Sequence, residues 1–135
     1  MITTTATKTP RTLIAAGTSV AAGTPQRAAV DLRTKHGGVL TVKLTNGATG
    51  PTAQAVATLM IAHDAGTLPA TGAAGAVWKT LQVLGGGGTT ANAVTELAYI
   101  VPQGVMHLQV EIAGNTGQAV TGEAYLSELT DFQTA

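Results

Sequence analysis

The sequence predicts an all-β protein, an antiparallel sandwich with an extended N-terminal arm. Three observations support this fold class. Segments with period-two alternation of apolar and polar residues recur, turn signals rich in Gly, Pro and Asn separate them, and no segment has a convincing helical period. About seven to nine short strands suit an immunoglobulin-like or jelly-roll-like sandwich. With 135 residues, the chain can bury one core without disulfides or metals.

The predicted organisation is an extended N-terminal arm, a β-sandwich domain and a C-terminal tail, over residues 1–25, 26–130 and 131–135. The first dozen residues are rich in Thr, which favours extended backbone. Met1 and Ile2 are their only large apolar side chains, too few to offset about 1–2 kcal/mol of backbone entropy per ordered residue. We therefore expect the arm to pair with a neighbouring subunit rather than with its own sandwich. The alternative is a first strand packed on its own domain.

Three strands are predicted in the first third of the chain. Residues 13–22 are mildly apolar and end at a Gly-Thr-Pro turn, and residues 28–33 alternate apolar and polar side chains. Residues 39–46 have the strongest pattern of the three, with alternate side chains directed inwards: Leu40, Val42 and Leu44.

The middle of the chain is less regular. Residues 52–63 are ambiguous, because their Ala content suits a helix whereas Val56, Thr58 and Ile61 suit a strand, which we predict. A loop rich in Gly, Ala and Thr follows over residues 64–75. Two further strands are predicted at residues 76–84, which contain Trp78, and at residues 94–101.

The stretch from residue 101 to residue 129 has the clearest periodicity. One face of residues 106–112 carries Met106, Leu108, Val110 and Ile112, and the other, predicted to be wet, carries His107, Gln109 and Glu111. Residues 114–117, Gly-Asn-Thr-Gly, suit a hairpin turn. Residues 118–129 return as a strand with Val120 and Leu126 buried and Glu123 exposed. The resulting antiparallel hairpin could place Glu111 opposite Glu123 on its wet face.

Charged residues are scarce and balanced. The chain has seven Lys and Arg residues and seven Asp and Glu residues. Together they make up 10% of the sequence, where about a quarter is typical. Such a surface relies on uncharged polar groups or on a partner that covers it. The absence of a basic surplus argues against nucleic acid, and 3% aromatic residues argue against a base-stacking platform. No segment has the ~20 apolar residues of a membrane span, and the N-terminus lacks the apolar run of a signal peptide.

No catalytic, cofactor-binding or metal site is predicted, and we do not expect an enzyme. The three histidines, His36, His63 and His107, lack ligand spacing, and there is no Cys. Residues 85–90, Gly-Gly-Gly-Gly-Thr-Thr, lack the Lys and the following helix of a phosphate loop, so a flexible hairpin loop is predicted. No cleft signal adjoins the carboxylates available for acid–base work, which are Asp31, Asp64, Glu96, Glu111, Glu123 and Glu128.

Aromatic side chains offer one further possibility. Trp78 with Tyr99 or Tyr125 could form a small sugar-binding platform, although core packing is the better assignment for Trp78.

Two stretches, residues 31–52 (DLRTKHGGVLTVKLTNGATGPT) and residues 101–130 (VPQGVMHLQVEIAGNTGQAVTGEAYLSELT), resemble small structural proteins of tailed bacteriophages that decorate or cement the capsid. The resemblance implies a β-sandwich module without active-site residues, often trimeric, bound to the outside of the major capsid shell. The arm lies outside the matching stretches.

Three functions follow as expectations. The first is a virion structural protein on the capsid surface, whose partners are the major capsid protein and other copies of itself. The second is another virion part, such as a tail tube or tail tip subunit. The third is a carbohydrate-binding module, which would require exposed aromatic rings. Neither nucleic acid nor a membrane is an expected partner.

Overall fold

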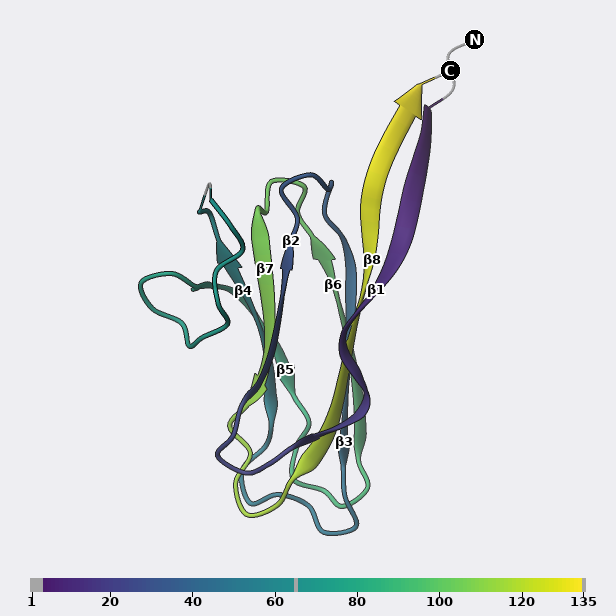
Figure 1. Ribbon diagram of the computed structural model, residues 1–135. Coiled ribbons are helices and arrows are strands. Elements are labelled where there is room, and N and C mark those ends of the chain that lie inside the picture. Colours follow the sequence, from purple (N-terminus) through teal and green to yellow (C-terminus); the bar gives the residue numbers. More distant parts are fainter. Residues whose placement is uncertain (1–3, 65, 135) are drawn as a thin grey trace.

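The computed structural model describes residues 4–64 and 66–134, which form strands and loops without a helix. The strands are β1 Thr4–Val20, β2 Gln26–Asp31, β3 Gly38–Asn46, β4 Val56–Ala62, β5 Lys79–Gly86, β6 Val94–Val101, β7 His107–Ala113 and β8 Val120–Thr134. They form two antiparallel sheets of four strands, in the order β1-β8-β3-β6 (sheet A) and β2-β7-β4-β5 (sheet B). The sheets pack face to face (Figure 1), which confirms the predicted all-β sandwich.

The connectivity is that of a jelly roll. Among the described strands, β4 and β5 are the one consecutive pair that lies in the same sheet, and every other connection crosses between sheets. An eight-stranded double sheet of this kind is a jelly roll, whereas an immunoglobulin constant-type sandwich has seven strands. The ambiguous segment at residues 52–63 contains β4, as predicted, and residues 64–75 are an irregular loop.

The core lies between the sheets and follows the predicted alternation. Successive residues of β3, and of β8 from residue 120 to residue 129, alternate between buried and more exposed positions. Five residues predicted to be buried in the last two strands are at most 2% exposed: Leu108, Val110, Ile112, Val120 and Leu126. Glu111 and Glu123 are more exposed than these residues, as predicted.

The predicted hairpin between the last two strands is wrong. β7 pairs with β2 and β4, whereas β8 pairs with β1 and β3 in the opposite sheet. Gly114 and Gly117 do have the positive φ that the turn chemistry predicted, +96° and +80°. Their turn carries the chain across the core from one sheet to the other. Glu111 and Glu123 therefore belong to different sheets and do not face each other.

The predicted wet face of β7 is also wrong at two of its three residues. His107 and Gln109 are both 0% exposed. The reason is the long loop between β4 and β5, which folds back over the outer face of sheet B. Beneath this loop, a second cluster of buried residues packs against Ala29: Met60, Ala62 and Trp78. A strand that is buried on both faces needs such a cover.

The N-terminal arm pairs with the chain's own C-terminus. β1 and β8 are antiparallel from Thr4 opposite Thr134 to Val20 opposite Val120. Beyond the sandwich they continue as a two-stranded ribbon, residues 4–8 with 129–134, which projects from one end of the molecule (Figure 1). The expectation that the arm avoids its own sandwich is therefore wrong for the described residues, because residues 131–134 of the expected tail supply a pairing edge.

The expected arm of residues 1–25 divides into two parts of different character. Ile14 and Val20 are buried in the main core, so the second half of β1 is a core strand of sheet A. The described ribbon residues of β1, in contrast, are all exposed. A truncation that tests the ribbon must therefore stop before the core half begins.

β7 and β8 approach each other closely across the core at Gly122. A Cβ atom at this position would lie 2.6 Å from Ile112 Cδ1. Gly122→Ala should lower the free energy of unfolding by about 1–3 kcal/mol, the usual cost of overpacking. Ile112→Val removes that Cδ1 atom, so the double variant should be more stable than the sum of the two single effects predicts. Urea unfolding measures all three variants, and additive effects would contradict the contact.

Candidate functional site

The loop between β4 and β5 is held on sheet B by hydrogen bonds from buried side chains. The Gln109 Nε2 donates to the Gly72 carbonyl oxygen at 2.7 Å, and its Oε1 accepts from the Gly72 N–H at 2.9 Å. The Trp78 Nε1 donates to the Ala70 carbonyl oxygen at 2.8 Å. Gln109 thus pairs with the backbone of a loop in the way that a neighbouring strand would. This explains why a polar side chain can occupy a fully buried position.

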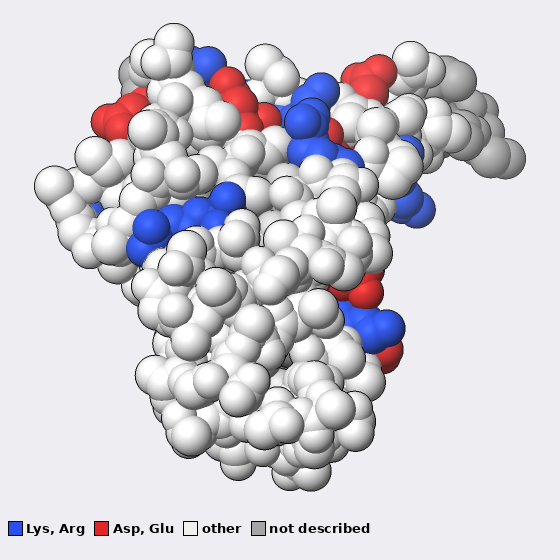
Figure 2. All heavy atoms as spheres, turned by 60° about the horizontal axis from the view of Figure 1, so that its bottom comes forward, with Lys and Arg blue, Asp and Glu red and all other residues white. Residues whose placement is uncertain are grey.

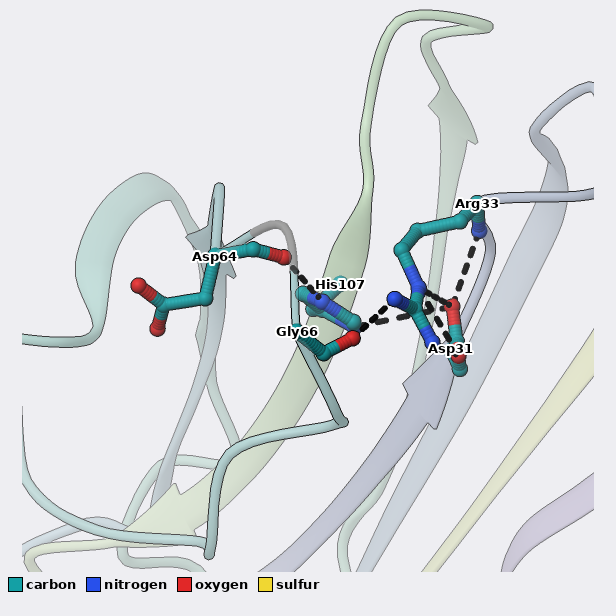
Figure 3. A network of polar contacts seen from close by, with 5 residues as sticks. All are labelled: Asp31, Arg33, Asp64, Gly66 and His107. Carbon is teal, nitrogen blue, oxygen red and sulfur yellow. Dashed lines mark hydrogen bonds and ion pairs between the residues drawn. The ribbon is translucent and has the colours of Figure 1, made fainter.

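A polar network joins the same loop to the end of β2 (Figure 3). The His107 Nε2 lies 2.9 Å from the Asp64 carbonyl oxygen and must carry the hydrogen, because a carbonyl only accepts. The His107 Nδ1 lies 3.6 Å from Asp31 Oδ1. Arg33 donates to both carboxylate oxygens of Asp31, at 2.7–3.1 Å, and also to the Gly66 carbonyl oxygen. The network fastens the loop to sheet B, and its histidine is fully buried.

Asp31 should make the protein less stable as the pH falls from about 4 to about 2. Side-chain hydrogen bonds from Arg33 hold the pKa of Asp31 at about 2, below its ordinary 3.8, with further lowering from the Arg33 backbone N–H and from the charges of Arg33 and His107. Because the unfolded chain binds this proton more tightly, the stabilisation is complete above the unfolded pKa and is lost as the pH falls through the folded value. Solvent screening limits its size, since the carboxylate is about one-third exposed.

The measurement is urea unfolding of wild type and Asp31→Asn across this pH range. The stability difference between them should shrink towards the acid end. A difference that stays constant with pH would show that Asp31 does not titrate as the geometry indicates.

Most of the candidate carboxylates are neutralised by partners within the chain. Glu111 accepts a hydrogen bond from Arg27 at 2.6 Å, Glu123 lies 3.9 Å from Lys43, and the buried Glu128 pairs with Arg11. His36 and His63 are not in the network that contains His107; instead the His36 ring packs edge-on against Phe132, with centroids 4.8 Å apart. Within residues 4–64 and 66–134, no group of three His, Cys, Asp or Glu could hold a metal. Glu111, Glu123 and Glu128 thus each form an ion pair with a different basic residue of the same chain.

The glycine run at residues 85–88 is anchored and does not form a free hairpin loop. The buried Asn46 donates through Nδ2 to the carbonyl oxygens of Gly87, Gly88 and Thr90, at 3.3, 3.2 and 2.9 Å. The Gly88 N–H donates to Gln54 Oε1 at 3.1 Å. A Cβ on Gly86 would lie 2.3 Å from the end of the exposed Gln54 side chain, so Gln54 packs directly against the glycine run. Sequence analysis assigned no role to Asn46.

The proposed platform of Trp78 with a tyrosine does not form. Trp78 is 2% exposed in the second core, and Tyr99 packs against the main core. Tyr125 alone of the three lines a groove of about 360 Å³ on the outer face of sheet A. The other polar groups that line this groove are Thr41, Lys43, Glu96 and Glu123.

One end of the sandwich carries no charged residue. The loops between β1 and β2, β3 and β4, β5 and β6, and β7 and β8 all meet at this end, over residues 21–25, 47–55, 87–93 and 114–119. None of them contains Lys, Arg, Asp or Glu. Figure 2 shows the resulting broad uncharged surface, with the charged side chains confined to other parts of the view. We call these four loops the charge-free end.

No protein-family model and no curated protein matches the chain. Among solved structures it is similar to the SPBc2 prophage-derived protein YomS, with 16% identity, a TM-score of 0.45, and 91% of this chain and 95% of that chain covered. It is also similar to the Family 16 Carbohydrate Binding Module-2, with 10% identity, a TM-score of 0.44, and 88% and 75% covered. A third is the infectious bursal disease virus VP2 subviral particle, with 11% identity, a TM-score of 0.44, and 95% of this chain but 32% of that chain covered.

These similar structures thus include a prophage-derived protein, a viral particle protein and a carbohydrate-binding module. At these TM-scores and identities, the likeness transfers no function from any of them to this chain. None of the described residues forms a helix long and apolar enough to cross a membrane.

Proposed function

We propose that this chain is a structural protein of a tailed-bacteriophage virion, a decoration or cement subunit. It binds the outside of the major capsid shell and stabilises that shell. The resemblance of residues 31–52 and 101–130 to such proteins supports the proposal, as does the low charge of the chain. The observation that carries it is the projecting ribbon, which has the features of an assembly element.

The ribbon is poorly stabilised by its own chain. An isolated pair of strands is marginally stable in water. The described ribbon residues of β1 are all exposed. β1 is an edge strand of sheet A, so its second edge has no strand partner among residues 4–64 and 66–134. Such an edge is a template for pairing with another chain. We infer that the ribbon pairs with a second copy by strand addition and supports a homo-oligomer such as a trimer.

Purified protein mixed with capsid shells that lack it provides the test. We expect saturable binding to the outside of the shells, seen by co-sedimentation and electron cryo-microscopy, and a higher temperature of shell disruption. A monodisperse monomer that leaves empty shells unbound would overturn the proposal.

A matched truncation tests the role of the ribbon. A variant that begins at residue 9 lacks one ribbon strand but keeps Arg11 and the core residues Ile14 and Val20. We expect it to fold with near-normal thermal stability and to lose self-association in analytical ultracentrifugation. An unchanged oligomeric state would show that the ribbon does not join copies.

A carbohydrate-binding module is the second candidate, favoured by the groove beside Tyr125. Binding of glycans in an array, abolished by Tyr125→Ala without loss of folding, would support it. A tail tube or tail tip subunit would be distinguished from a decoration protein by the position of the chain in images of the whole virion.

A further inference from the structure

We propose that the charge-free end is the surface that seats this chain on the shell, and that its partner is an uncharged patch of the major capsid protein. This inference rests on the proposed function and names the contact surface.

The first argument is charge. A surface loop usually carries charged residues, yet none of the seven basic and seven acidic residues lies in these four loops. Burial of this end therefore leaves no charge unpaired and requires no charge to be desolvated.

The second argument is rigidity. The Asn115 Nδ2 donates to the carbonyl oxygens of Val20 and Gln118, both at 3.0 Å, and the side chain of Asn115 is buried. Asn46, the last residue of β3, holds the loop at residues 87–93 by hydrogen bonds to three of its carbonyl oxygens. Thr52 and Thr116 join the loops at residues 47–55 and 114–119 through their hydroxyl groups at 2.7 Å. The loops are thus cross-linked before any partner arrives, which lowers the entropy lost on binding.

The third argument is side-chain size. The exposed residues of the charge-free end are mainly Ala, Gly and Thr, with some Asn and Gln. Short side chains lose little rotamer freedom and allow close approach of another backbone, and their hydroxyl and amide groups can form hydrogen bonds with it. This chemistry fits an uncharged protein surface and does not fit nucleic acid, which needs a basic surplus.

The position of the end in the molecule supports this choice of partner. The ribbon projects from the opposite end of the sandwich (Figure 1). Copies that associate through their ribbons therefore leave their charge-free ends available to a different partner. In the proposed virion, that partner is the shell.

The test introduces a charge at this end. Ala91→Lys and Ala48→Lys place lysine at exposed positions of two loops of the charge-free end, and Thr34→Lys, exposed in the loop between β2 and β3, is the matched control. We expect each of the first two variants to bind shells at least about tenfold more weakly than wild type, because a charge becomes buried without a partner. The control should bind as wild type does, and all three should keep wild-type thermal stability.

Salt dependence supplies an independent measurement. Wild-type binding should change by less than about twofold between about 0.05 and 0.5 M NaCl, since no ion pair forms at the contact. This inference would be overturned, and the proposed function left intact, by any of three results. Ala91→Lys and Ala48→Lys could bind shells as tightly as wild type, the Thr34→Lys control could lose as much affinity as they do, or wild-type binding could depend steeply on salt. A wild-type protein that does not bind shells would instead overturn the proposed function, and this inference with it.

Discussion

Replacing Trp78 by alanine should lower the free energy of unfolding by about 3–5 kcal/mol, the usual cost of deleting a buried large aromatic side chain. Trp78 is 2% exposed and packs with Met60 and Ala62 on the outer face of sheet B. The variant also loses the hydrogen bond from Trp78 Nε1 to the Ala70 carbonyl oxygen, which helps to hold the long loop in place. Urea or thermal unfolding measures the change.

Two control variants separate packing from general damage to the fold. Val83→Ala, on the neighbouring strand β5 and 54% exposed, should change stability by less than about 0.5 kcal/mol. Trp78→Phe keeps an aromatic ring but loses the donor, so its cost should be smaller than that of alanine. If Trp78→Ala kept full stability and lost only glycan binding, the ring would belong to a sugar platform and the second core would be wrong.

Replacing Arg11 by methionine should lower the free energy of unfolding by about 2–4 kcal/mol. The carboxylate of Glu128 is 1% exposed, and Arg11 is its ion-pair partner. Removing one member of a fully buried pair costs about 3–5 kcal/mol, because it leaves a charge without compensation. The expected loss is somewhat smaller here, since the Arg11 side chain is 46% exposed and water can reach its position.

The matched control for Arg11 is an exposed ion pair of the same sheet. Lys43 lies 3.9 Å from Glu123 and is 43% exposed, so Lys43→Met should cost less than about 1 kcal/mol. The double variant Arg11→Met with Glu128→Leu should recover much of the lost stability, because no charge is then left buried. Equal costs for Arg11→Met and Lys43→Met would mean that Glu128 is not buried as described.

Local alternation was sufficient to predict the strands and their inward faces. In β3 the side chains alternate without exception, and the inward set of Leu40, Val42 and Leu44 is buried. The same period correctly placed the core residues of β7 and β8. This succeeds because successive side chains of a strand point to opposite faces, so one buried position specifies the rest.

Composition was equally informative about what the chain lacks. The scarcity of charge predicted a surface that relies on uncharged polar groups, but it did not show that the charges avoid one end of the molecule. Because the four loops of the charge-free end are far apart in the sequence, only the fold brings them together. The hydrogen bonds by which Asn46 and Asn115 hold these loops could not be predicted for the same reason.

Strand pairing was decided by the tertiary structure. A turn such as residues 114–117 has the same local chemistry whether its strands pair with each other or cross between sheets. Crossing was selected because it places the apolar faces of β7 and β8 opposite each other, with Gly122 against Ile112. The burial of His107 and Gln109 had a similar origin, because the loop that covers both residues is far from them in the sequence. The sequence by itself therefore determined which residues share a face, whereas long-range packing determined which strand or loop each face meets.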